Sequence, residues 1–401
     1  MEISEAGKDF PVIRKGGIIY LDSACQSLRP DSVIKAMIEY YEDLSSCGGR
    51  SVHGMSSKVS VEMDETREKL ASFFGTKDPD CYIFTKNCTE GINTVARGLH
   101  FSSSDTVVTT DTEHNSNHVP WLLLSKEVGV KRRFSKSSGD GEFDIEEFKK
   151  CMDRSVKLVS ICHSGNVTGC VVPVKEVTEI AHDYGAEVLV DGSQAAPHMK
   201  VDLSKLDVEY YSLSVHKMLG PSGMGLLYGK RECLDKLRPL CSGGGTVGIV
   251  TYDTAESAPI PDRFEAGLQN YSGIMGTRAA IEYLEKIGME NITLNDRALM
   301  KNILSETEDI KGLEVVGPKD NEKRCGVFSF NIKGMSPHDV AMMLDKADNI
   351  MIRSGMHCSH PFFIRENIDG SARASVYLYN TKEDVTRFSS ALRKIAETFS
   401  H

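Results

Sequence analysis

The chain has 401 residues, of which 40% are hydrophobic and 26% charged, a composition typical of a folded enzyme and unlike a disordered or collagen-like chain. A formal net charge of −10 provides no basic face by composition, so no nucleic-acid partner is expected. The N-terminus lacks an apolar signal core, and no stretch approaches the ~20 apolar residues that span a bilayer, so no membrane partner is expected either. These features predict a cytoplasmic protein of two or three domains.

From about residue 80, short apolar runs alternate with segments of helical period. The predicted strands are 82–84, 105–110, 130–135, 157–162 and 186–190, and the predicted helices are 90–99, 119–128, 144–152 and 174–184. This alternation predicts a mostly parallel sheet that is covered by helices on both faces.

Beyond residue 205 the pattern changes. Strands are predicted at 208–213 and 225–229, followed by an irregular stretch at 241–273 that is rich in Pro and Gly. A long helical run at 274–305 is expected to link two domains. Residues 313–401 read as strand, helix, strand, loop, strand and helix, which predicts a compact α+β unit.

Two polar residues lie at or near the ends of predicted strands, where open α/β sheets place their ligand crevice. Lys217, in the segment SLSVHKMLGP, could lower its pKa by desolvation and form a Schiff base, although an isolated lysine of this kind is usually an exposed turn residue. Asp191 ends an apolar strand and could pair with a cationic ring nitrogen. The alternative for Asp191 is a helix cap or a salt bridge.

Two further segments suggest cofactor contacts. Residues 85–93 turn from a strand into a helix start, where free backbone N–H groups and the hydroxyl of Thr89 could hold a phosphate. The alternative is a capping box built on Thr89 or Asn87. His114 follows another strand end and could stack on a planar cofactor, whereas a lone histidine is more often a hydrogen-bonded structural residue.

The eleven cysteines are scattered, odd in number and without a CxxC pair, which predicts a reducing compartment and mostly buried, inert thiols. Cys358 stands apart because it lies in the loop RSGMHCSHP, beside imidazoles and an arginine that favour a reactive thiolate. A zinc site made of His357, Cys358 and His360 is the alternative, but the ligands are crowded and no second cluster appears, so no metal is expected.

These five segments, in this order, resemble the pyridoxal-phosphate enzymes of fold type I, specifically the class V aminotransferase superfamily. Within it, they are most similar to the Suf-type (group II) cysteine desulfurases and selenocysteine lyases. The likeness runs from Ile19-Tyr-Leu-Asp-Ser-Ala24 through Arg50-Ser-Val-His53 and Phe264-Glu-Ala-Gly267 to Arg373-Ala-Ser.

The resemblance implies an α/β fold with a mostly parallel seven-stranded sheet flanked by helices, plus a small α+β C-terminal domain. The expected boundaries are 1–16 for an N-terminal segment packing on the small domain, 17–285 for the large cofactor domain and 286–401 for the small domain.

The resemblance also implies roles for individual residues around pyridoxal 5′-phosphate. Lys217 would be the Schiff-base lysine and move protons at the substrate α-carbon, Asp191 would keep the ring nitrogen protonated, and His114 would stack on the ring and take part in catalysis. The other implied cofactor residues are Thr89, Ser214 and His216 at the phosphate, Cys88 in the phosphate loop, and Asn166 and Gln194 at the ring hydroxyl. Arg373 would bind the substrate carboxylate, with Arg353, His357 and Asn166 as further substrate residues.

Cys358 would distinguish a desulfurase within this superfamily. It stands 373 − 358 = 15 residues before Arg373, similar to the short-loop group. Its thiol would attack the sulfur of L-cysteine, leaving alanine and a persulfide for a sulfur-acceptor protein in iron–sulfur cluster assembly or a thiolation pathway. A homodimer with the site at its interface is expected.

Three alternatives stay open at this point: a selenocysteine lyase acting on L-selenocysteine, a class V aminotransferase or epimerase, and a non-enzymatic sulfur-carrier docking protein. Intact Lys217 and Asp191 argue against the last.

Three positions depart from the family pattern. Leu268 stands where the family usually has a hydroxyl residue that reaches the phosphate across the dimer. Asn87-Cys88 replaces a Gly-Thr pair, and Met356 replaces a frequent histidine. These departures suggest a divergent branch.

Overall fold

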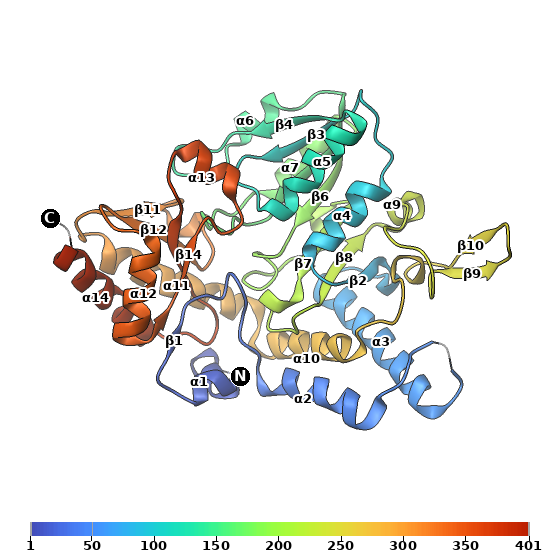
Figure 1. Cartoon of the computed structure of the whole chain (residues 1–401), viewed down its shortest axis with the longest axis horizontal. Helices are drawn as coiled ribbons and strands as arrows, with labels where there is room; N and C mark the ends of the chain where they lie inside the picture. Colours follow the sequence, from blue (N-terminus) through green and yellow to red (C-terminus); the bar gives the residue numbers. More distant parts are fainter. Residues whose placement is uncertain (1, 50, 400–401) are drawn as a thin grey trace.

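The structure is a computed structural model of the chain and describes residues 2–49 and 51–399. Its core is built around a seven-stranded sheet, and a four-stranded sheet lies to one side of it (Figure 1). Within the described ranges, no helix combines the length and the apolar character that crossing a membrane requires.

The larger sheet confirms the predicted mostly parallel, seven-stranded architecture. Strands β3 to β7 run parallel, and β8 and β2 complete one edge in antiparallel pairing. Across the sheet the strands are β2 (Tyr82–Thr85), β8 (Gly225–Gly229), β7 (Tyr210–Ser214), β6 (Glu187–Asp191), β5 (Val156–Cys162), β3 (Thr106–Thr110) and β4 (Lys131–Ser135).

Both faces of this sheet are buried, as parallel strands require. Val107 and Leu158 face a cluster with helices α4, α5 and α9, whereas Val108 and Val159 face a cluster with α3, α7 and α10. The alternation follows from the two-residue period of side chains along a strand. The flanking helices are α3 (Gly54–Phe73), α4 (Cys88–Gly98), α5 (Val119–Val128), α6 (Ile145–Lys150), α7 (Val174–Asp183), α8 (Leu203–Leu206) and α9 (Arg231–Lys236).

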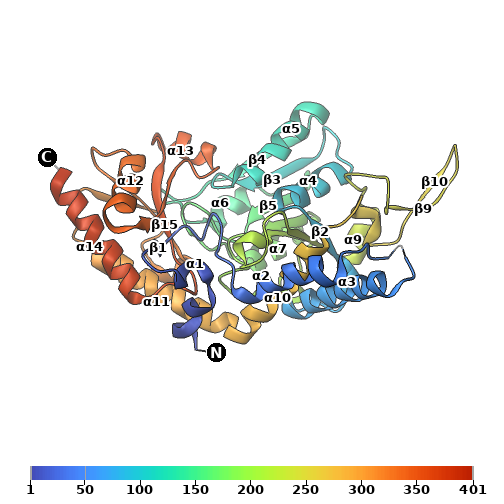
Figure 2. The ribbon, with the colours of Figure 1, turned by 60° about the horizontal axis from the view of Figure 1, so that its bottom comes forward.

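The predicted long helical run at 274–305 is in fact two helices, α10 (Tyr271–Ile287) and α11 (Met289–Thr307). Gly288 separates them with a φ of 89°, a left-handed conformation that glycine adopts without a steric penalty. The two helices run from the larger towards the smaller sheet (Figure 2). Helix α2 (Asp31–Glu39) packs along α10.

The stretch at 241–273, predicted as irregular, contains a hairpin of strands β9 (Val247–Val250) and β10 (Ala255–Ser257). Its Gly- and Thr-rich composition hid the strands from the sequence pattern. The hairpin projects away from the body of the molecule in both views (Figures 1 and 2). Ile249 and Tyr252 on it are exposed.

The smaller sheet, antiparallel throughout, contains one strand more than the sequence pattern predicted. Its order is β11 (Leu313–Val316), β12 (Val327–Ile332), β15 (Ser371–Ser375) and β14 (Arg353–Gly355). The accompanying helices are α12 (Pro337–Asp348), α13 (His360–Glu366) and α14 (Lys382–Phe399). Pairing of β14 with β15 places Arg353 directly opposite Arg373.

The N-terminal segment runs along both units. After a 3₁₀ turn (Ile3–Asp9) and α1 (Pro11–Arg14), strand β1 (Ile19–Tyr20) pairs in parallel with β13 (Ile350–Met351). The buried ring of Phe10 packs edge-on against Tyr283 of α10 and against Tyr379, at centroid distances of 5.8 and 4.8 Å. Further short turns cover Tyr40–Leu44, Pro79–Cys81, Asn115–Asn117, Val215–Lys217, Asp262–Phe264 and Asn321–Lys323.

A buried ion pair ties the FEAG segment to the edge of the larger sheet. A carboxylate oxygen of Glu265 lies 2.6 Å from Nη2 of Arg67, and the other oxygen accepts the backbone N–H of Phe84 at 2.8 Å. Both charged side chains are at most 5% exposed. Removing one partner would therefore leave a charge buried without compensation.

We expect Glu265→Ala to lower the free energy of unfolding by about 3–5 kcal/mol, because Arg67 and the Phe84 amide lose their acceptor together. Urea denaturation of the purified protein measures this loss. Glu256→Ala, on the exposed strand β10, is the matched control and should change stability by less than about 0.5 kcal/mol. If both substitutions lowered stability by equally small amounts, the buried Arg67–Glu265 ion pair would not have the stabilising role described here.

Candidate active site

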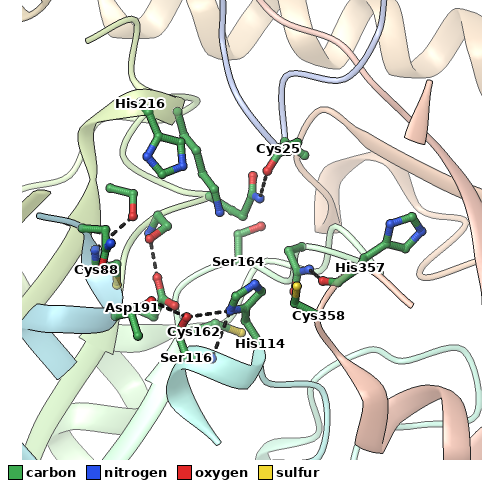
Figure 3. Close-up of a pocket in the computed structure, with 18 of the residues that line it drawn as sticks. Cys25, Cys88, His114, Ser116, Cys162, Ser164, Asp191, His216, His357 and Cys358 are labelled. Atoms are coloured by element: carbon green, nitrogen blue, oxygen red, sulfur yellow. Dashed lines mark hydrogen bonds between the residues drawn. The ribbon is translucent and has the colours of Figure 1, made fainter. Parts of the chain in front are cut away.

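A single cavity of about 230 Å³ lies at the carboxyl ends of the parallel strands and brings together every predicted site residue. Figure 3 shows how side chains from both units point into it. The predicted residues that line it are Cys88, Thr89, His114, Asn166, Asp191, Gln194, Ser214, His216, Lys217, Arg353, His357, Cys358 and Arg373. Their individual roles remain predictions.

The phosphate-loop segment is arranged so that the side chain of Thr89 does not serve as the helix cap. Asn87 caps helix α4 by accepting the N–H of Glu90 at 3.0 Å, and Glu90 in turn accepts the N–H of Lys86. Asn87 therefore supplies the helix cap, whereas Glu90 accepts the N–H of Lys86 and not the N–H of Asn87 that a complete capping box would use. The hydroxyl of Thr89 instead faces the cavity, 2.7 Å from the hydroxyl of Ser116.

Strand β8 passes so close to this loop that only glycine fits at one position. A Cβ atom at Gly225 would overlap the backbone of Asn87. Ser214, at the end of β7, accepts the N–H of Cys88 at 3.0 Å and thereby joins the loop to the strand that leads to Lys217. The helix N-terminus and the hydroxyls of Thr89 and Ser214 form a donor set suited to a phosphate.

Lys217 and Asp191 come from neighbouring strand ends. Burial, reinforced by the positive charge of Arg373, lowers the pKa of Lys217, and the Asp191 carboxylate opposes that shift. Asp191 is 7% exposed and accepts the N–H of Ser193 at 2.9 Å. A partly desolvated amine facing a carboxylate is the arrangement that a carbonyl-binding lysine needs.

His114 lies in the same cavity, in the loop that follows β3. Burial, together with the nearby charge of Lys217, lowers its pKa to about 4. Its Nδ1 lies 2.9 Å from the hydroxyl of Ser116. Beneath it, the buried carboxylate of Glu113 accepts from Thr110 and Asn117 and holds the loop on the sheet.

We expect the His114 ring to stay mostly neutral from pH 8 down to about pH 5 and to reach its midpoint near pH 4, because its pKa is lowered to about 4 from the usual value of about 6.5. Ring-proton NMR of the cofactor-free protein across this range measures it. The signal is assigned by its absence in His114→Asn. A midpoint near 6.5 would contradict the environment described for this ring.

Besides Nδ1 of His357, two buried polar atoms of this cavity have no partner among the residues the structure describes. They are Oε1 of Gln194 and Nε of Arg373, whose side chains are both 3% exposed. Buried polar atoms are normally satisfied, so a ligand is the expected partner. Together with the phosphate donors and Asp191, they fit a phosphorylated pyridine ring and a substrate carboxylate.

Arg373 is held in place from two directions. Its Nη1 donates to the carbonyl of Asn166 at 2.9 Å, and its Nη2 lies 3.4 Å from a carboxylate oxygen of Asp22. The other oxygen of Asp22 lies 3.5 Å from Nη1 of Arg353. One carboxylate thus faces two guanidinium groups, which leaves a net positive charge for an anionic substrate.

The Cys358 loop is exposed, strained and pinned to the larger unit. His357 and Cys358 both have positive φ, at 47° and 57°, which costs about 1–2 kcal/mol for each non-glycine residue. The N–H of Asn115 donates to the carbonyl of Cys358 at 2.6 Å. Nδ2 of Asn166 donates to the carbonyl of His357 at 2.7 Å, and its Oδ1 accepts from Ser359 at 3.0 Å.

His357, next to Cys358 in the loop, is a neutral ring in this structure. Burial, with a further contribution from Arg373, lowers the pKa of His357 to about 3, so its ring is neutral. Its Nε2 lies 3.0 Å from the carbonyl and the hydroxyl of Ser371. Arg353, which interacts electrostatically with Cys358, is the positive charge that remains beside the thiol.

We expect Asn166→Ala to release the Cys358 loop, because two hydrogen bonds of about 1 kcal/mol each no longer hold its strained backbone. Hydrogen exchange over 356–360 should speed up about 30-fold, the factor that about 2 kcal/mol corresponds to. Asn302→Ala, on α11 and away from the cavity, is the control. Unchanged hydrogen exchange at 356–360 in Asn166→Ala would show that these two hydrogen bonds do not hold the loop in place.

The structure does not assemble the alternative zinc site. His357 contacts Ser371, and Nδ1 of His360 lies 2.9 Å from Nδ2 of Asn115. No group of three or more potential ligands suited to a metal was found in the part of the chain that is described.

Sequence reasoning missed some lining residues, chiefly Cys25, Ser116, Ser193 and Cys162. The signal for Cys25 was its position directly after the Leu21-Asp-Ser-Ala24 motif. Leu268 is 65% exposed and lies outside this cavity. Arg50 of the predicted motif lies outside the described residues, and His53 caps helix α3.

A mostly parallel sheet with a desolvated lysine, an aspartate and a phosphate cradle at its carboxyl edge defines the pyridoxal-phosphate enzymes of fold type I. The family model of the class-V aminotransferases matches residues 19–388. This chain therefore belongs to the class-V aminotransferase family, and the predicted fold class and pyridoxal-phosphate enzyme class are confirmed.

Individual relatives agree with this assignment over the whole chain. A probable cysteine desulfurase of Halalkalibacterium halodurans is 38% identical over 408 residues and 100% of both chains. A cysteine desulfurase from Thermococcus onnurineus NA1, solved in its apo form, covers 98% of both chains at 36% identity and a TM-score of 0.95. The cysteine desulfurase CsdA of Escherichia coli covers 99% of both at 27% identity and a TM-score of 0.91.

Proposed function

We propose that this protein is a pyridoxal-phosphate-dependent cysteine desulfurase, which converts L-cysteine to L-alanine and takes up the sulfur on Cys358 as a persulfide. The observation that carries the proposal is the position of Cys358, an exposed thiol that lines the same cavity as Lys217 and Arg373. An aminotransferase needs a lysine and a carboxylate-binding arginine in such a cavity, but it needs no thiol there.

The residues that would hold the cofactor follow from the donor set. Thr89, Ser214 and His216 would bind the phosphate, and Asp191 would face the ring nitrogen. When bound, pyridoxal phosphate supplies an electron sink that labilises bonds at the α-carbon of an amino acid. His114, as a neutral ring in the same cavity, would pack on the face of the pyridine.

The chain's own residues would bind the substrate, transfer the proton and accept the sulfur. Arg373 would hold the substrate carboxylate through its free Nε, and Lys217 would move a proton at the α-carbon. The Cys358 thiolate would attack the substrate sulfur, so that the carbon–sulfur bond breaks, a sulfur–sulfur bond forms and the carbon gains a proton as alanine. Atoms balance as cysteine plus thiol giving alanine plus persulfide.

Partners and setting belong to the same proposal. The exposure of Cys358 supports delivery of its sulfur to an acceptor protein, and the exposed apolar hairpin residues Ile249 and Val250 support a homodimer. All eleven cysteines are free, which supports a reducing compartment such as the cytoplasm. The domain boundaries 1–16, 17–285 and 286–401 stay part of this proposal. The seven-stranded sheet before residue 286 and the four-stranded sheet after it support them, although β1 pairs with β13 across that boundary.

Alanine release from L-cysteine, L-selenocysteine and L-cysteine sulfinate, by protein loaded with the cofactor, tests the proposal. A desulfurase gives alanine from L-cysteine and a persulfide on the protein. Alanine from L-selenocysteine alone would identify a selenocysteine lyase, and pyridoxamine phosphate would identify an aminotransferase. Absence of a visible absorption band after loading would favour a non-enzymatic protein.

A further inference from the structure

A short segment of the larger unit, residues 166–168, lies between the smaller sheet and the Cys358 loop. The amide of Asn166 makes two hydrogen bonds to the residues on either side of Cys358, at 2.7 and 3.0 Å. The side chain of Val167 is buried against two phenylalanines of α13, the helix that follows the loop. The position of this segment therefore sets the position of the Cys358 loop.

The three backbone carbonyls of this segment all accept hydrogen bonds from buried side chains of the smaller unit. The pairs are Nη1 of Arg373 with the carbonyl of Asn166 at 2.9 Å, the hydroxyl of Ser329 with that of Val167 at 2.6 Å, and Nη2 of Arg324 with that of Thr168 at 3.4 Å. All three donor residues are at most 3% exposed. No backbone N–H of the described residues donates to these carbonyls, so the segment depends on the side chains.

Ser329 is the donor that serves this segment alone. It lies on β12 directly opposite Arg373 on β15. Directly opposite residues of antiparallel strands project to the same face of a sheet, so both side chains reach neighbouring carbonyls of one segment. Among the described residues the Ser329 hydroxyl has no other hydrogen-bond partner, whereas Arg324 also donates to two carbonyls of its own unit.

We propose that Ser329 is a positioning residue, which fixes the 166–168 segment and through it both Arg373 and the Cys358 loop. This inference rests on the proposed desulfurase function, in which Arg373 binds the substrate carboxylate and Cys358 takes up the sulfur. Without the hydroxyl, the buried carbonyl of Val167 has no donor, which favours a shift of the segment. The carbonyl and the amide of Asn166 shift with it, so one buried hydroxyl affects both groups.

The first measurement is hydrogen exchange over 356–360 in the cofactor-loaded protein without substrate. Ser329→Ala should speed up this exchange about fivefold, the factor to which one hydrogen bond of ordinary strength corresponds. Ser329→Cys, which keeps a weaker donor, should lie between Ser329→Ala and wild type. Thr178→Val is the matched control, because it removes a buried hydroxyl–carbonyl hydrogen bond of 2.8 Å within α7, and it should leave exchange at 356–360 unchanged.

A double-substitution cycle separates positioning through this segment from a general loss of stability. Asn166→Ala alone removes both hydrogen bonds that join the segment to the loop. Adding Ser329→Ala should then not accelerate exchange at 356–360 any further. Two independent effects would instead multiply, to about fivefold beyond Asn166→Ala.

The second measurement is the KM for L-cysteine of the cofactor-loaded variants. Displacement of Arg373 should raise KM about fivefold in Ser329→Ala, the effect of about one hydrogen bond, whereas Thr178→Val should keep the wild-type KM.

Unchanged exchange at 356–360 in Ser329→Ala, a further fivefold acceleration in the double variant, or a wild-type KM in Ser329→Ala would each overturn the inference while the desulfurase proposal stands. Absence of alanine release from L-cysteine by the wild-type protein would contradict that proposal instead. The exchange experiment needs no turnover, so the two failures are distinguishable.

Discussion

Lys217→Ala is expected to lower kcat for alanine release from L-cysteine by about 10³-fold or more, within the range that removal of a proton-transfer group costs. The lysine lies in the turn after β7, where burial lowers its pKa and Asp191 faces it. The lowered pKa favours the neutral amine at this position, and the described residues offer no other lysine that lines the cavity. Single-turnover alanine formation measures the loss.

Lys175→Ala, on the exposed side of α7, is the matched control and should retain wild-type kcat. Circular dichroism and gel filtration should show the same fold for both variants. A small primary amine added to Lys217→Ala should restore part of the rate, because it can supply the missing proton acceptor. Retention of more than a tenth of wild-type kcat would contradict the role of Lys217.

Cys358→Ala is expected to keep the visible absorption of the bound cofactor and to lose persulfide formation entirely. Alanine release from L-cysteine should fall at least about 100-fold, because no other group of the loop offers a polarisable nucleophile. L-selenocysteine should be affected less, since selenium leaves more readily than sulfur. Absorbance, alanine and protein-bound sulfane sulfur are measured on the same sample.

Cys241→Ala is the control for this experiment, because Cys241 is exposed but lies outside the cavity. It should behave as wild type in all three measurements. Normal desulfuration of L-cysteine by Cys358→Ala would show that the thiol does not take part in the reaction.

The central sheet and its site were accessible from the sequence because both depend on local patterns. The apolar runs that end at Asp191 and before Lys217 predict strands, and parallel strands bring their carboxyl ends to one edge. Cys358 and Arg373 lie more than 130 residues further along the chain, and the likeness to a family, rather than any local pattern, assigned them to the same site.

Other features depend on contacts that a single sequence does not reveal. A run of helical residues does not show that Gly288 adopts a φ of 89° and divides it in two. The neutral state of His357 follows from burial and from Arg373, which strand pairing brings near. Cys25 lines the cavity from the N-terminal segment, and no helix or strand pattern near it in the sequence shows that placement.

The most direct measurement of the proposed reaction is a single turnover of the cofactor-loaded protein with L-cysteine and no acceptor. One equivalent of alanine per active site and one added sulfur atom on the peptide that contains Cys358 are expected. Alanine and free sulfide with an unmodified Cys358, or pyruvate in place of alanine, would contradict it.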